Sequence, residues 1–146
     1  MEVDTLQEGV YEFSNSYLHL IVDEDNKLLY SEWTRQPTGQ EYRDAASVFA
    51  VFLQESKILY WIQDTSNIGA VTLEDMKWVM DVLIPVASHS ALRKLARITC
   101  HTPNIEQFKE LAHQSIKPFQ SDIEVRHFKS YRDAADWIEG ISDAGH

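Results

Sequence analysis

Apolar and polar residues alternate with the period of a β-strand in two neighbouring segments near the start of the chain. Residues 17–22 (YLHLIV) and 28–33 (LLYSEW) are strand-like, and the polar segment 23–27 (DEDNK) between them has the length of a hairpin loop. We therefore predict an antiparallel β-hairpin. A shorter apolar run at residues 10–13 fits either a further edge strand or a tail, and residues 1–9 fit a flexible tail.

After the hairpin the apolar period changes to that of a helix, and helical runs recur four times. Each run follows a Ser, Thr or Asn with Glu, Asp or Gln three residues later, a pairing that satisfies free backbone N–H groups at a helix start. The second helix is expected to stop near Pro85. The four start signals are Thr38, Thr72, Asn104 and Ser130. The apolar runs that alternate with the helices are residues 57–63, 94–100 and 123–128.

This order of elements predicts the α/β class. Strands connected through helices run parallel, with right-handed connections, so we predict a mixed, mostly parallel sheet of about five strands with an N-terminal antiparallel hairpin and four helices. No linker rich in Pro, Gly or Ser and no internal repeat interrupts the pattern. Residues 1–146 are therefore expected to form a single domain.

Several short motifs follow the same order along the chain. They are Leu29-Tyr30-x-x-Trp33, the strand ILYWIQD that ends at Asp64, Trp78 and Pro85 of the second helix, the strand KLARIT, and the closing Phe128-x-Ser130-x-x-Asp133-Ala134-x-x-Trp137. With these motifs the chain resembles the bacterial STAS-like (SpoIIAA-like) family, typified by anti-sigma-factor antagonists. The resemblance covers nearly the whole chain and implies the STAS-like fold. The chain is also similar to SEC14-like proteins, whose larger members bind lipids.

The resemblance also indicates two candidate phosphorylation sites. In the antagonists, a strand that ends in Asp-x-Ser precedes an Asp-Ser-Ser-Gly turn whose serine is phosphorylated. Here Asp64-Thr65-Ser66 resembles the strand end, the turn is missing, and Thr72 lies near the phosphorylation position. Thr72 and Ser66 are the candidates. A helix cap is the simpler interpretation of Thr72, because the two carboxylates that follow it would repel a phosphate.

Polar residues also follow the strands that are expected to run parallel. Ligands of open α/β sheets bind outside the carboxyl ends of the strands, so this edge is the default site. The candidate ligand- or partner-binding residues are Asp64, Thr65, Ser66, Asn67, His101, Thr102 and Ser130. The connection of residues 64–71 contains Gly69 and is long enough to shape a pocket. The alternative is a structural turn that Asp64 caps.

Charge favours some partners over others. The 146 residues carry 13 Lys and Arg against 23 Asp and Glu, a net charge of −10, and all of the excess lies in residues 1–75. Such a surface repels nucleic acid and suits a basic partner. The alternative explanation of the uneven charge is ordinary solubility. The local basic group is Arg93, Lys94 and Arg97, and Arg97 is expected to face outward or to pair with acidic residues.

Catalytic and metal-binding motifs are not found in the sequence. It has no nucleophile elbow, dinucleotide loop or phosphate loop, and its six histidines lack metal-ligand spacing. We expect no enzyme activity, no metal and no cofactor. Cys100 is expected to be a buried apolar residue, because its neighbour His101 points to the opposite face of a strand. No apolar segment reaches the ~20 residues of a membrane helix, and the N-terminus lacks a secretory signal, so a cytoplasmic protein is expected.

Three hypotheses for function follow. The first is a non-enzymatic regulatory or protein-interaction module, whose partner is another protein or a second copy of the chain. The second is a carrier of a small apolar or anionic ligand in a cleft at the carboxyl edge of the sheet. The third is a weak enzyme at the same edge that uses Asp64, Ser66 or His101. Aromatic residues such as Phe49 and Trp61 are expected to fill the core rather than to line a cavity, because the chain is short.

Overall fold

A mixed sheet of seven strands organises the molecule. The computed structural model describes residues 3–99, 106, 109–111, 113 and 122–140. The strands lie in the same order in the sheet as in the chain. They are β1 (Asp4–Gln7), β2 (Val10–Ser14), β3 (Leu18–Asp23), β4 (Leu28–Trp33), β5 (Tyr60–Asp64), β6 (Lys94–Ile98) and β7 (Glu124–Phe128). Strands β1 to β4 pair antiparallel, and β4 to β7 pair parallel.

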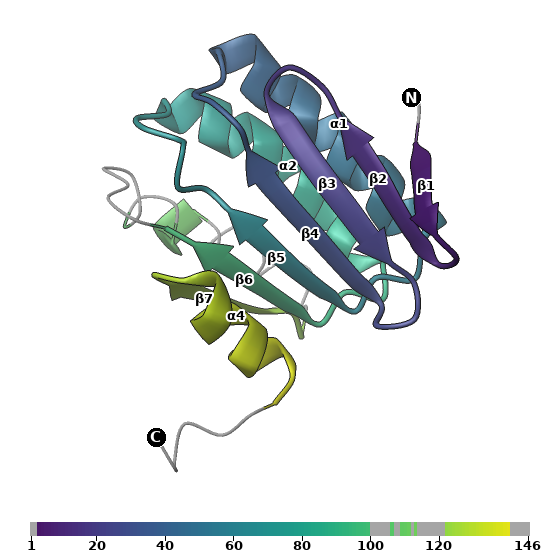
Figure 1. Ribbon diagram of the computed structural model, residues 1–146. Coiled ribbons are helices and arrows are strands. Elements are labelled where there is room, and N and C mark those ends of the chain that lie inside the picture. Colours follow the sequence, from purple (N-terminus) through teal and green to yellow (C-terminus); the bar gives the residue numbers. More distant parts are fainter. Residues whose placement is uncertain (1–2, 100–105, 107–108, 112, 114–121, 141–146) are drawn as a thin grey trace.

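Helices cover the two faces of the sheet unequally. Helices α1 (Gly39–Glu55) and α2 (Leu73–Ser88) lie side by side behind the sheet in Figure 1, and α4 (Tyr131–Ile138) lies in front of it. Residues 106, 109–111 and 113, between β6 and β7, are also helical. The α/β class, the antiparallel N-terminal strands and the parallel C-terminal strands are confirmed.

The number of strands differs from the prediction, which was about five, and the sheet is not mostly parallel, because three of its six strand pairs are antiparallel. The run at residues 10–13 belongs to β2, and β1 lies within residues 1–9, where a flexible tail was expected. All four residues of β1 are exposed, so no burial pattern marks this strand in the sequence. The turn between β1 and β2 places Gly9 at φ 80°, a conformation that glycine adopts readily.

The helix starts follow the capping signals wherever the structure describes them. Thr38 and Glu41 form a complete capping box at α1. The side chains of Thr72 and Ser130 accept the backbone N–H groups of the residues three positions later, at α2 and α4. The start at Asn104 lies outside the described residues.

Helix α2 continues past Pro85, contrary to the expected stop. Proline removes one backbone donor, so the carbonyl of Asp81 loses its helical partner, but Asp81 is exposed to water. Ala87 is buried against the core and holds the last turn in place. The helix then ends at Ser88.

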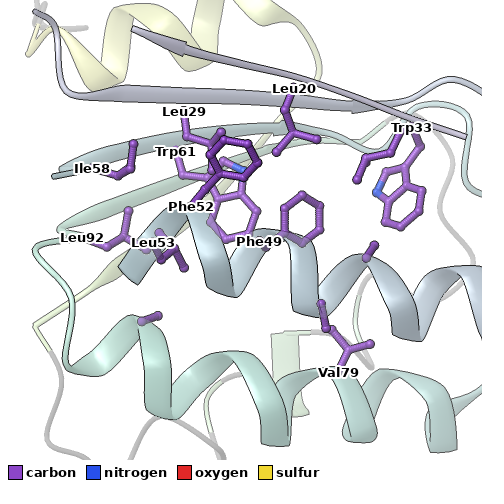
Figure 2. Close-up of a cluster of buried hydrophobic side chains, with 14 of the residues drawn as sticks. Leu20, Leu29, Trp33, Phe49, Phe52, Leu53, Ile58, Trp61, Val79 and Leu92 are labelled. Carbon is purple, nitrogen blue, oxygen red and sulfur yellow. The ribbon is translucent and has the colours of Figure 1, made fainter. Parts of the chain in front are cut away.

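Aromatic rings between the sheet and α1 form the centre of the main core (Figure 2). The Phe49 ring lies 4.8 Å from Trp61 and 6.2 Å from Trp33 between centroids, and Trp33 stacks on Tyr42 at 5.7 Å. The Trp61 indole N–H donates to the buried Ser31 hydroxyl at 2.9 Å. Phe49 and Trp61 are buried in the core, as predicted. The expectation that they do not line a cavity is wrong, because both also line the cavity described below.

A smaller core lies on the opposite face, beneath α4. Ala134 of α4 packs against Ile62, Ala96 and Ile98. The Trp137 ring packs against the Phe128 ring, with their centroids 5.6 Å apart. Helix α4 therefore covers the parallel strands on the face that α1 and α2 leave open.

The position of Phe49 gives a test of the main core. Replacing Phe49 by Ala should lower the free energy of unfolding by about 3–5 kcal/mol, because a buried ring is lost and a cavity remains. The matched change Leu73→Ala, at a side chain that is 49% exposed, should cost less than about 1 kcal/mol. Urea denaturation measures both values. Equal losses would contradict this description of the core.

Candidate functional site

The predicted residues at the carboxyl end of β5 form a compact turn. The Asp64 carboxylate accepts the backbone N–H of Ser66 at 2.8 Å. The backbone N–H and the hydroxyl of buried Thr65 both donate to the carbonyl of Ile98 at 2.8 Å. The Asn67 amide donates to the carbonyl of Trp33, also at 2.8 Å. These bonds tie β5 to the ends of β6 and β4.

The remaining predicted site residues are dispersed or outside the described part of the chain. Ser130 and Thr72 cap two helices on opposite faces of the sheet. His101, Thr102 and Cys100 lie outside the described residues. The structure thus brings Asp64, Thr65, Ser66 and Asn67 together, and their role in binding stays a prediction.

A cavity of about 100 Å³ lies between α2 and the sheet. Its wall is almost entirely apolar and is contributed by β4 to β7, α1, α2 and the segments that connect them. Ile68 brings the connection of residues 64–71 to this wall. The expected filling of the core by aromatic side chains is therefore incomplete on this side.

Among the described residues of its lining, three polar side chains interrupt the apolar wall of the cavity: Tyr42, Gln63 and Arg97. Arg97 is only 5% exposed, and its Nε donates to the Gln63 side-chain oxygen at 3.2 Å. Burial lowers the pKa of Arg97 to about 10, although the nearby Tyr42 acts to raise it. Because this value is far above neutral, the guanidinium keeps its charge.

The buried position of Arg97 corrects one of its two expected arrangements, in which the side chain faces outward. The other, a pairing with acidic residues, stays a prediction. Arg97 lies opposite Gln63 in the parallel pairing of β5 and β6, and it shares its face with Leu95, two residues earlier. Leu95 and Arg97 both line the cavity, so Arg97 points toward the helices. Strand alternation places Arg97 on the face of Leu95, but Ala96 and Ile98 make the other face of β6 apolar too, so the sequence alone does not identify this orientation.

A second feature is the outer face of β2, β3 and β4. The pairing register and burial pattern place nine side chains there, three of which are acidic and none of which is Lys or Arg. Among the described residues, the helix on this side, α4, packs mainly on β5, β6 and β7. We call these side chains the open face: Val10, Glu12, Ser14, His19, Ile21, Asp23, Leu28, Tyr30 and Glu32.

A shallow hollow of about 390 Å³ lies within the open face. Val10, Ile21 and Leu28 give it apolar walls, and Asp23 adds a carboxylate. Tyr131 of α4 closes one side, with its ring 5.7 Å from the ring of Tyr30.

A chain of hydrogen bonds crosses the open face. The His19 ring bonds Glu12 at 2.7 Å through Nε2 and Glu32 at 3.0 Å through Nδ1. The Tyr30 hydroxyl donates to the second oxygen of Glu32 at 3.2 Å. Burial and then the carboxylates of Glu32 and Asp64 raise the pKa of Tyr30, so its hydroxyl stays protonated.

His19 and His127 have pKa values shifted in opposite directions. Burial alone would lower the pKa of His19, but the hydrogen bonds to Glu12 and Glu32 offset it and raise the pKa above 6.5. The pKa of His127 falls to about 4, through burial and the positive charges of Arg97 and Lys109.

The sequence also predicted that metal and membrane features are absent. Over the described ranges, no group of three or more His, Cys, Asp or Glu residues is placed to hold a metal ion. Nor does any helix there have the length and apolarity needed to cross a bilayer.

Comparisons with known proteins return no relative. No family model matches the chain, and neither a curated protein nor a solved structure shows significant similarity to it. The function must therefore be argued from the cavity and the open face themselves.

The raised pKa of His19 has a measurable consequence for stability. Protonated His19 stabilises the folded state, and this contribution is fully present below pH 6.5 and lost as the pH rises through the folded pKa. In NMR titrations, Glu12→Gln combined with Glu32→Gln should lower the pKa of His19, because burial then acts without the carboxylates. The same variant should lose the extra stability at low pH.

The control exchanges two exposed carboxylates elsewhere, Glu55→Gln with Glu106→Gln. It should leave the His19 titration unchanged. His127, near pH 4, is an internal reference in both variants. A wild-type His19 that titrates at or below pH 6.5 would contradict the hydrogen-bond network.

Proposed function

We propose that this protein is a non-enzymatic protein-interaction module of the STAS-like (SpoIIAA-like) fold, and that its open face binds a basic, extended segment of another protein. The observation that carries the proposal is the composition of the open face. Its carboxylates Glu12, Asp23 and Glu32 surround apolar side chains, and no Lys or Arg is among its nine residues. Charge complementarity therefore selects a basic partner.

The hollow suits a long basic side chain. The hydrocarbon stem of a Lys or Arg can lie along Val10, Ile21 and Leu28, while its charged head reaches Asp23. The rings of Tyr30 and Tyr131 offer cation–π contacts beside it. Alternate side chains of an extended segment would then meet the carboxylates and the apolar residues of the face in turn.

The non-enzymatic part of the proposal is supported by the polar turn at the end of β5. The Asp64 carboxylate, which a weak enzyme would employ, accepts the backbone N–H of Ser66 and so stabilises the turn. This arrangement favours a binding module over catalysis. The ligand-carrier hypothesis is supported by a different observation, the cavity beside Arg97.

A peptide in which Lys alternates with Val tests the partner class. Isothermal titration should detect binding of this peptide and none of a Glu–Val peptide, and affinity should fall with added salt. Glu12→Gln with Glu32→Gln should weaken binding about fivefold, since exposed charge pairs contribute roughly 0.5 kcal/mol each. Glu55→Gln with Glu106→Gln, which changes the net charge equally, is the control. Equal weakening by both would mean unspecific attraction and would overturn the proposal.

The place of binding is tested by one introduced charge. Ile21→Lys puts a cation at the centre of the open face and should reduce binding of the Lys–Val peptide more than tenfold, about 1.4 kcal/mol or more, through repulsion. Ser47→Lys, at an exposed position on α1, adds the same charge elsewhere and should have little effect. Sedimentation of the wild type measures whether the chain forms a dimer. A dimer that Ile21→Lys dissociates would replace the basic partner with a second copy of the chain.

A further inference from the structure

His19 is the only basic side chain among the nine residues of the open face. It lies between two carboxylates from the neighbouring strands, Glu12 on β2 and Glu32 on β4. One ring nitrogen is 2.7 Å from an oxygen of Glu12, and the other is 3.0 Å from an oxygen of Glu32. The charge of this part of the face therefore depends on the protonation of one imidazole.

The two hydrogen bonds of His19 form together only when its ring is protonated. A neutral imidazole has one N–H and one bare nitrogen, whereas an imidazolium has an N–H on each nitrogen. Between two ionised carboxylates the imidazolium satisfies both bonds, and it offsets one of the two negative charges. Loss of the proton leaves one carboxylate without its donor and doubles the negative charge of the cluster.

The side chains around His19 are of types that keep their charge near neutral pH. Tyr30 donates to Glu32 on the same strand, and burial and then the Glu32 carboxylate raise the pKa of its hydroxyl. Asp23 of β3 and Tyr131 of α4 are the further ionisable groups of the adjoining hollow. Of these side-chain types, only an imidazole ordinarily changes its charge near neutral pH.

We propose that His19 makes the open face pH-sensitive, because the neutral ring leaves Glu12 and Glu32 free for a cation of the basic partner and the protonated ring repels that cation. This inference rests on the proposed binding of a basic segment. The proton and the partner's cation compete for the same two carboxylates, so binding releases a proton from His19. By linkage, the bound partner must lower the pKa of His19.

The affinity for the basic partner should rise with pH. Burial acts to lower the pKa of His19, but the hydrogen bonds to Glu12 and Glu32 outweigh it and hold the pKa above 6.5. The ring is thus protonated below pH 6.5, where binding is weakest, and binding strengthens as the pH rises through the folded pKa. Because the three side chains are partly exposed, the change should be about fivefold.

Isothermal titration with the Lys–Val peptide, acetylated at its N-terminus, measures this change in affinity. Between about pH 5.5 and about pH 8.5, at constant ionic strength, the peptide keeps its charge and the wild type should bind about fivefold more tightly at the upper end. His19→Gln, which cannot carry a proton, should remove this pH dependence. The control His89→Gln, at an exposed position at the end of α2, should retain it.

NMR titration of His19 in the wild type gives a second readout. Saturating Lys–Val peptide should move the titration of His19 to lower pH and leave that of His127 in place. A Glu–Val peptide should leave both unchanged. This measurement decides the question alone if circular dichroism shows that His19→Gln is not folded.

The outcomes separate this inference from the proposed function. Equal affinity of the wild type at both ends of the pH range, or an unchanged pH dependence in folded His19→Gln, would overturn the role of His19 and leave the binding of a basic partner intact. A titration of His19 that the bound peptide does not lower would do the same. Absence of binding at every pH would overturn both proposals.

Discussion

The handedness of the connections between parallel strands determines the layout of this protein. Strands β4 to β7 lie in chain order, so each connection steps one strand in the same direction across the sheet. Right-handed connections that step in one direction place their helices on one face. Helices α1 and α2 follow this rule, and α4, which follows the last strand, is on the opposite face over β5 to β7 (Figure 1). The outer face of β2 to β4 consequently receives no helix among the described residues.

The two faces of the sheet therefore have different chemistry. The inner face carries the aromatic core and, at its margin, the buried guanidinium of Arg97 beside a cavity. The Nε of Arg97 donates to the Gln63 side chain of the neighbouring strand. The open face carries carboxylates that His19 bridges. The basic partner that we propose would therefore bind on the open face, away from the buried guanidinium.

Much of the fold could be predicted from the sequence because local signals and packing agree. The alternation in β3 and β4 and the caps at Thr38, Thr72 and Ser130 all correspond to observed elements. Strand β1 could not be predicted, because its side chains are exposed and only backbone pairing defines it. The end of α2 was predicted wrongly at Pro85 for a related reason. The packing of the following turn against the core outweighs the one hydrogen bond that proline removes.

The candidate site was harder to predict than the fold. The turn at Asp64 has the composition of a binding loop, yet its hydrogen bonds serve the backbone and Asn67 holds β4. The open face depends on which strands the helices leave uncovered, which no local pattern encodes. The Glu12–His19–Glu32 bridge likewise needs the register of three strands. The orientation of Arg97 could not be predicted either, because both faces of β6 are apolar and covered by helices.

The central claim, that the sheet between β2 and β4 is covered on one side and accessible on the other, is tested most directly by thiol labelling at adjacent positions. In a background in which Cys100 is replaced by Ser, Ile21→Cys places a thiol on the open face and Leu20→Cys places one in the core. The account predicts rapid reaction of the first with a water-soluble thiol reagent and strong protection of the second. Equal protection of both positions, in folded protein, would contradict it.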